Sequence, residues 1–116
     1  MIPEYWQNFI AKNEIVGSDF EISEEDDLSD MGADLRIMNI EQCISEATEC
    51  YPGIAAIKEN YVPVAMCLSG SGDYYYIRST EGENGSLYRI YHDAVNDEDI
   101  INDGIEKVLN SYASLL

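Results

Sequence analysis

The sequence predicts a single α+β domain, residues 1–116, in which helices flank a central antiparallel or mixed sheet. Three observations favour this fold class. A chain of 116 residues with 46% apolar residues suits one domain with one core. Residues 62–93 hold three short apolar or alternating runs separated by two glycine-rich turns, the pattern of an antiparallel meander. Helical patterns lie outside this block, as expected when helices cover one face of a sheet.

Residues 3–13 are expected to form the first helix. The proline at its start suits a first helical position, and Trp6, Phe9 and Ile10 recur three and four residues apart on one face. Residues 19–23 then alternate between polar and apolar side chains, which predicts a short strand.

The acidic segment, residues 24–34, is the most polar part of the chain. Residues 14–34 contain nine acidic residues and no basic one. A charge run of this kind is usually a solvated face, so we expect a loop or a frayed helical turn. Leu28 and Met31 are expected to be its anchors to the core.

A second helix is expected from Asn39 through Cys50, after a short strand at residues 35–38. Asn39 suits the N-cap, and Gln42 follows three residues later, as in a capping box. Tyr-Pro-Gly at residues 51–53 ends the helix. Its buried stripe is expected to comprise Ile40, Cys43, Ile44 and Ala47.

The meander follows a segment, residues 54–61, that fits either a plain connection or one turn of helix. Its strands are expected at residues 62–68, 73–80 and 87–91. Asn84-Gly85 is a strong hairpin signal before the third strand. The second strand is expected to place Tyr74 and Tyr76 on one face, and Tyr75 and Ile77 on the other.

The end of the chain predicts an acidic loop at residues 93–103 and then a final helix. That helix is expected to begin at Asp103 or Gly104. Apolar residues recur after this point at helical spacing. They are Ile105, Val108, Leu109, Tyr112 and Leu115.

The net charge restricts the possible partners. Six Lys and Arg residues against 23 Asp and Glu residues give a formal charge of −17 and an isoelectric point near 4.1. A small domain needs a net charge of only roughly 2–8 in magnitude to be soluble. Solubility alone remains an alternative explanation for any individual carboxylate. Nucleic acids and anionic membranes are excluded as direct ligands, because binding them needs Lys and Arg. Basic proteins remain as possible partners.

The cysteines and the amino terminus favour a cytoplasmic protein. Cys43, Cys50 and Cys67 are an odd number in a domain with ample apolar residues, so reduced thiols are expected. The amino terminus lacks the basic segment and apolar run of a signal peptide. The longest apolar run, residues 62–68, is far too short to span a membrane.

No pattern in the chain predicts catalysis, a metal or a cofactor. The turn at residues 70–72 (Gly-Ser-Gly) leads into a strand and lacks lysine, whereas a phosphate loop needs a helix N-terminus. His92-Asp93 can orient a general base, but no motif supplies a nucleophile. Cys43 and Cys50 are about 10 Å apart along a helix, too far for one tetrahedral zinc ion.

Four stretches of the chain form an ordered set: PEYWQNFIAKN near the amino terminus, CLSGSGDYYYI, IYHD, and IINDGIEKVLNSY near the carboxyl terminus. In these stretches the chain resembles the SUKH superfamily, also called the SMI1/KNR4 family. In order and spacing the resemblance covers roughly the last half of the chain, while the first half matches loosely. Asn13 is followed by Glu14, where the family normally has glycine. The resemblance implies an SMI1/KNR4-like α+β fold without enzymatic activity.

The same resemblance implies a function as a bacterial immunity protein. Many bacterial members look like immunity proteins of polymorphic toxin systems, which bind and neutralise toxins that are often nucleases. A nuclease has a basic substrate-binding surface, which an acidic domain can be steered onto and occupy. The expected partner-binding residues are Glu24, Glu25, Asp26, Asp27, Asp30 and Asp34, with Asp97, Glu98 and Asp99 as a second patch.

Two other functions remain open. A regulatory scaffold or ligand-sensing module of the same fold would have a specific pocket, lined by Trp6 and the meander tyrosines, and affinity indifferent to salt. An enzyme would need a cleft in which His92, a carboxylate and a nucleophile converge.

Overall fold

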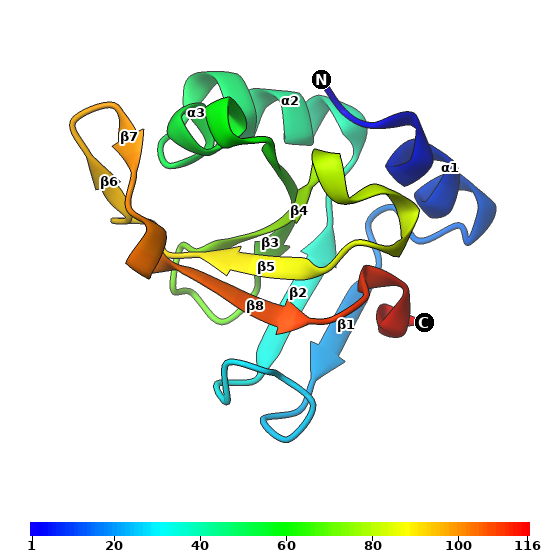
Figure 1. Ribbon diagram of the computed structural model, residues 1–116. Coiled ribbons are helices and arrows are strands. Elements are labelled where there is room, and N and C mark those ends of the chain that lie inside the picture. The colour runs from blue at the N-terminus through cyan, green and yellow to red at the C-terminus, as the bar shows by residue number, and fades with distance from the viewer.

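The fold is built on a curled sheet of six antiparallel strands in the order β1-β2-β3-β4-β5-β8 (Figure 1). The computed structural model describes all 116 residues. A separate hairpin pairs β6 with β7. The strands are β1 (Asp19–Ile22), β2 (Ala33–Ile37), β3 (Tyr61–Cys67), β4 (Tyr74–Arg78), β5 (Leu87–Ile90), β6 (Val95–Asn96), β7 (Asp99–Ile100) and β8 (Ile105–Leu109).

The helices lie beside this curled sheet, α1 and α2 packing into one apolar cluster and α3 into another, which confirms the α+β class (Figure 1). Every strand pair in the sheet is antiparallel, so the mixed alternative is not realised. The acidic segment connects β1 to β2 at the end of the sheet away from the helices. The helices are α1 (Glu4–Lys12), α2 (Ile40–Glu49) and α3 (Gly53–Ala56), with short 3₁₀ turns η1 (Ile57–Glu59), η2 (Ser79–Asn84), η3 (Asn102–Gly104) and η4 (Tyr112–Leu115).

Two apolar clusters occupy the two faces of the sheet. Tyr75 and Ile77 of β4 belong to the larger one, which also contains the buried face of α1. Tyr76, between them in sequence, belongs to a smaller cluster with α3 and the β6–β7 hairpin. The predicted alternation of faces along this strand is therefore confirmed, and it follows from the two-residue period of a β-strand.

The first helix packs as predicted and also holds the carboxyl terminus. Trp6 and Ile10 are buried in the larger cluster. The ring of Tyr112 in η4 meets Trp6 and Phe9 edge-on, with ring centroids 5.1 Å and 4.8 Å apart. Edge-to-face aromatic contacts of this kind add to the burial of apolar area. The two ends of the chain are joined through these rings.

The predicted capping box of α2 is present. The Asn39 side chain accepts from the backbone N–H of Gln42 at 2.8 Å, and Gln42 Oε1 accepts from the Asn39 N–H at 2.9 Å. The buried stripe is narrower than expected. Cys43 and Ala47 are buried, whereas Ile44 is exposed because it lies on the outer side of the helix.

The predicted carboxyl-terminal helix is wrong, since residues 105–109 form β8 and only η4 beyond it is helical. The register between β5 and β8 shifts where Leu87 pairs with Leu109 and Tyr88 pairs with Lys107. This bulge gives β8 one extra residue, and both Val108 and Leu109 are buried. Adjacent buried residues in a bulged strand imitate the spacing of a helical face.

Two turns also differ from expectation. Asn84-Gly85 does not form a tight hairpin turn, because η2 fills the connection and Gly85 has a φ of −70°. The left-handed conformation that a two-residue primed turn requires is therefore absent at this glycine. Residues 93–103, expected to be a loop, contain the β6–β7 hairpin, which turns at Asp97 with a φ of 58°.

Candidate protein-binding surface

The acidic segment is held against the sheet by a buried ion pair. Arg89 of β5 places Nη2 3.2 Å from Oδ2 of Asp27. Arg89 is only 3% exposed and Asp27 only 1%. Charged residues are almost never buried to this extent unless they are paired. Each of the other ion pairs has at least one exposed partner. Asp27 and Arg89 therefore form the ion pair in which both side chains are buried.

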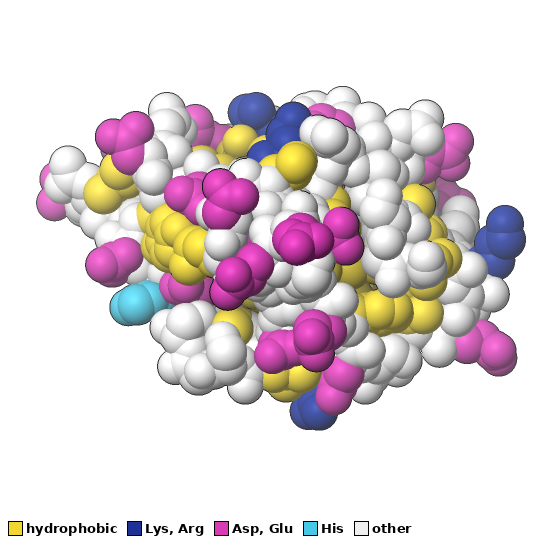
Figure 2. All heavy atoms as spheres, turned by 90° about the horizontal axis from the view of Figure 1, so that it is seen from below, with side chains coloured by type: hydrophobic (Ala, Val, Ile, Leu, Met, Phe, Trp, Pro, Cys, Tyr) yellow, Lys and Arg dark blue, Asp and Glu magenta, His cyan; other side chains and the backbone are white.

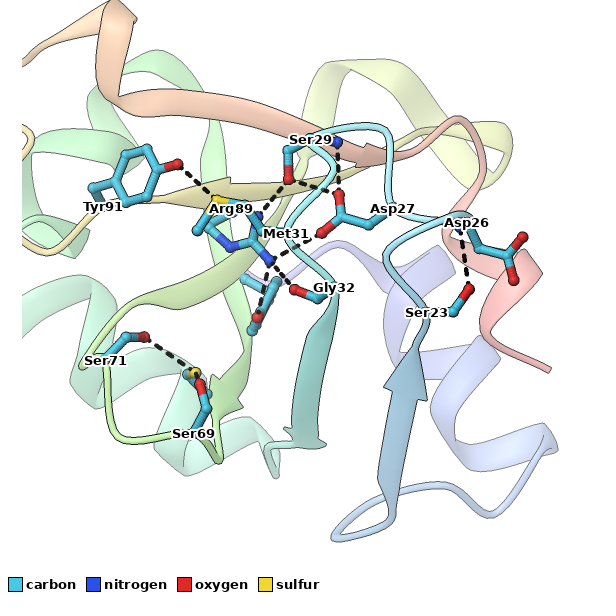
Figure 3. A network of polar contacts seen from close by, with 12 residues as sticks. Ser23, Asp26, Asp27, Ser29, Met31, Gly32, Ser69, Ser71, Arg89 and Tyr91 are labelled. Atoms are coloured by element: carbon cyan, nitrogen blue, oxygen red, sulfur yellow. Dashed lines mark hydrogen bonds and ion pairs between the residues drawn. The ribbon is translucent and has the colours of Figure 1, made fainter.

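Neighbouring groups satisfy the remaining polar atoms of the pair (Figure 3). Asp27 Oδ1 accepts from the N–H of Ser29 at 2.7 Å and from its hydroxyl at 2.6 Å. Arg89 Nη1 donates to the Ser29 hydroxyl, and Nη2 donates to the carbonyl of Gly32 at 2.8 Å. The guanidinium carbon lies 5.3 Å from the ring centroid of Tyr75. Such hydrogen bonds are what makes a buried ion pair tolerable.

The surroundings keep both members of the pair charged. Burial raises the pKa of Asp27, but hydrogen bonds from Ser29 and the charge of Arg89 outweigh it, so the pKa lies below its ordinary value. Burial lowers the pKa of Arg89, but Tyr75 and Asp27 outweigh it, and the pKa lies above its ordinary value. The interaction is therefore ionic at neutral pH.

A backbone hydrogen bond fixes the middle of the acidic segment to the far edge of the sheet. The N–H of Leu28 donates to the carbonyl of Val108 in β8 at 2.9 Å. The segment leaves the sheet at β1 and returns at β2, which are at the opposite end of the strand order. It therefore crosses between the two edges of the curled sheet and closes its open end (Figure 1).

Leu28 and Met31 are half-exposed, so they are not the main anchors that the sequence predicted, although the Met31 sulfur contacts Tyr91 and Arg89. They are 51% and 53% exposed. Asp27 and Arg89 take the anchoring role instead, since they form the buried contacts between the segment and the sheet. The ion pair and the Ser29 bonds hold the backbone. The Met31 thioether accepts from the Tyr91 hydroxyl at 3.1 Å and from Arg89 Nη1 at 3.6 Å.

Carboxylates surround these apolar side chains. Glu24, Glu25, Asp26, Asp30 and Asp34 are all exposed, as are the second-patch residues Asp97, Glu98 and Asp99. Figure 2 looks onto this end of the molecule and shows acidic side chains interleaved with apolar patches, with the Lys and Arg side chains towards the margins. We call the exposed part of residues 24–34 the acidic surface.

Asp27 must be removed from the predicted contact residues. It lies in the same run as its exposed neighbours, but its carboxylate is buried against Arg89 and is not accessible to a partner. The binding role of the other eight carboxylates stays a prediction.

The second acidic patch lies apart from the acidic surface. Asp97, Glu98 and Asp99 form the tip of the β6–β7 hairpin, which projects from another part of the molecule (Figure 1). Lys58 Nζ donates to the carbonyl of Glu98 at 2.6 Å and pairs with the Asp99 carboxylate at 3.1 Å. The structure does not bring the two predicted patches together, and Asp99 is partly neutralised.

His92 and Asp73 form a pair that joins two turns. The Asp73 carboxylate accepts from the backbone N–H of His92 at 2.8 Å and lies 2.9 Å from its Nδ1. The ring is 61% exposed, and no serine, threonine or cysteine side chain hydrogen-bonds to it. The pair connects the turn before β4 to the residues that follow β5, and Asp73 rather than the predicted Asp93 is the carboxylate partner.

The thiols occupy three separate environments. Burial raises the pKa of Cys43 to about 12. Cys50 is exposed, and Cys67 Sγ lies within hydrogen-bonding distance of the Ser69 and Ser71 hydroxyls. No three His, Cys, Asp or Glu side chains converge closely enough to hold a metal ion.

Trp6 and the meander tyrosines do not line one shared pocket, although Tyr88 lines a separate hollow of about 480 Å³ together with Tyr61. Trp6, Tyr75 and Tyr76 are fully buried. A hollow of about 620 Å³ lies beside α1, but Tyr5, Phe9 and Tyr112 provide its aromatic lining. These rings come from the two ends of the chain and not from the meander.

Sequence reasoning missed Arg89, the residue on which the acidic surface depends. One signal was present: Arg89 is the only charged residue in the run LYRIY, residues 87–91. A lone charge in a central strand must either face solvent or find a buried partner. Which of the many carboxylates is that partner follows only from the folded chain.

Comparisons with known proteins found no relative of this chain. No protein-family model, curated protein or solved structure matches it significantly. The structure contains no helix with the length and apolar character that crossing a membrane requires.

Replacing Asp27 by alanine is expected to lower the free energy of unfolding by about 3 kcal/mol, since it leaves the Arg89 charge buried and unpaired. Chemical denaturation at neutral pH measures this. Asp26→Ala is the control, because Asp26 is exposed, and its effect is expected to stay within about 0.5 kcal/mol. Equal effects of the two substitutions would contradict the anchoring role.

The Asp27–Arg89 pair also predicts that the free energy of unfolding depends on pH. Because folding lowers the pKa of Asp27, its contribution is fully present above the unfolded value of about 3.9. The contribution is lost as the pH falls below that value, through the folded pKa. The stability difference between wild type and Asp27→Ala should therefore shrink in acid, and a constant difference would argue against the ionic interaction.

A second pH prediction concerns the pKa of the His92 imidazole, which an NMR titration measures directly. The hydrogen bond to Asp73 raises the pKa of His92 above its ordinary value, and the Asp73 and Asp93 charges add to this. The pair therefore favours the folded state below the unfolded pKa, and this contribution is lost as the pH rises through the folded pKa. Asp73→Asn should lower the pKa more than Asp93→Asn; the reverse order would contradict the geometry.

Proposed function

We propose that this protein binds a basic protein through its acidic surface and acts by binding rather than by catalysis. The observation that carries the proposal is the arrangement of the acidic segment. Five exposed carboxylates surround the exposed Leu28 and Met31, while the one cation in contact with the segment, Arg89, is buried beneath it. A partner approaching this end of the molecule meets carboxylates interleaved with exposed apolar side chains.

The two kinds of side chain have different consequences for binding. Carboxylates on the rim steer a basic partner and raise the association rate, an effect that salt screens. Apolar side chains at the centre slow dissociation once they are covered. Because the ion pair holds the segment in place before binding, little ordering entropy is lost on association.

The resemblance to the SMI1/KNR4 family supports a more specific version of this proposal. In that version the protein is a bacterial immunity protein that acts in the cytoplasm and neutralises a cognate toxin. A nuclease toxin fits the charge, since its substrate-binding surface is built to accept phosphates. Covering that surface with carboxylates would block the substrate without any chemistry.

The test is a charge reversal at the acidic surface with a matched control elsewhere. The partner for this test is the product of the neighbouring gene, which the proposal expects to be the toxin, with association followed by stopped-flow fluorescence. Glu24→Lys/Glu25→Lys is expected to reduce the association rate on the order of tenfold at low salt and to flatten its salt dependence. Glu41→Lys/Glu49→Lys alters the net charge equally, at exposed positions on α2.

The control separates a specific surface from the effect of net charge. If both double variants slow association equally, the net charge acts without a defined surface. If neither changes the rate, the acidic surface is not where the partner binds.

A further inference from the structure

The free edge of β1 lies beside a hollow of about 440 Å³ at the acidic surface. The hollow lies between this edge and the carboxyl-terminal part of the chain. No Lys or Arg lines it. Its apolar lining comprises Ile22, Leu28, Leu109 and Leu115, and its carboxylates are those of Glu21 and Asp26.

The main chain of β1 has unused hydrogen-bonding groups that face away from the sheet. Glu21 pairs in register with Asp34 of β2. The carbonyl of Asp34 accepts from the N–H of Leu68, on the side of the next strand, so this register pair is not joined by hydrogen bonds. The N–H and C=O of Glu21 therefore point outward from the edge. Three residues earlier, the carbonyl of Ser18 points towards β2 and accepts from the N–H of Ile37. This agrees with the alternation of main-chain groups along a strand, in which residues an odd number apart face opposite edges.

The side chains of β1 define what kind of strand fits beside it. Ile22 is buried and Phe20 packs against the larger apolar cluster, both on the inner face. Asp19 and Glu21 are exposed on the outer face, where Asp19 pairs with Arg36 of β2 at 2.7 Å and Glu21 has no ion-pair partner. Directly opposed side chains on paired strands interact, so the complementary strand alternates apolar residues inward with basic residues outward.

Resting on the proposed function, we infer that the partner adds an extended segment of alternating basic and apolar residues to the edge of β1, with an apolar side chain entering the hollow. Strand addition of this kind combines main-chain hydrogen bonds with pockets for alternate side chains. A second copy of this chain does not fit, because its own β1 would set carboxylates against carboxylates. The charge on the edge therefore rejects self-association while it selects a basic strand.

The probe for this inference is the synthetic peptide acetyl-Arg-Val-Arg-Ile-Arg-Val-Arg-amide, added to the ¹⁵N-labelled protein. Strand addition is expected to shift the amide resonances of β1, most strongly at Glu21. Glu21→Pro removes the outward N–H, which an edge position tolerates, whereas Glu21→Ala removes only the charge. Loss of the main-chain bond should make Glu21→Pro bind roughly fivefold to tenfold more weakly than Glu21→Ala.

Peptides that are N-methylated at alternate residues test the inference without changing the protein. Each pattern blocks one edge of the peptide, so one pattern should abolish binding and the other should preserve it. The inference is overturned if both patterns bind alike or both fail, if Glu21→Pro and Glu21→Ala bind equally, or if the unmodified peptide does not bind. Shifts confined to residues 24–31 would also overturn it, while leaving the charge-dependent association of the proposed function intact.

Discussion

The buried ion pair between Asp27 and Arg89 is the interaction on which the acidic end of this protein depends. Transferring two charges from water costs several kcal/mol per ion, and their attraction offsets this only when the remaining polar atoms are also bonded. Ser29, Gly32 and Tyr75 provide those bonds. Hydrogen bonds are directional, so this network fixes the segment between β1 and β2 in one position. Apolar contacts are not directional and would not define that position by themselves.

That position gives the segment two roles at once. Underneath, it closes the gap between the two edges of the curled sheet through the bond from Leu28 to Val108. On the outside, it displays Leu28 and Met31 among carboxylates that repel one another. Self-repulsion destabilises a compact state, so the anchor beneath is what allows the charges to be held together. A surface organised in this way before binding suits a partner of opposite charge.

Local patterns were enough to predict α1, the capping box at Asn39, and the strands of the meander, because each depends on neighbouring residues. The end of the chain was not predictable in this way. A bulge opposite Leu87 buries adjacent residues of β8 and gives them helical spacing. The acidic surface was predictable as a charge run, but its anchor was not. Asp26 and Asp27 are identical side chains in sequence, and only an arginine 62 positions away distinguishes them.

Hydrogen exchange at the Leu28 amide tests the central claim most directly, in wild type and in Asp27→Asn, with β3 and β4 amides as internal references. The ion pair is predicted to protect this amide in wild type. In the variant it should exchange much faster, while the amides of the central strands stay protected, because only the segment is released. Equal protection of Leu28 in both proteins would show that the segment is held without the ion pair and would contradict the account.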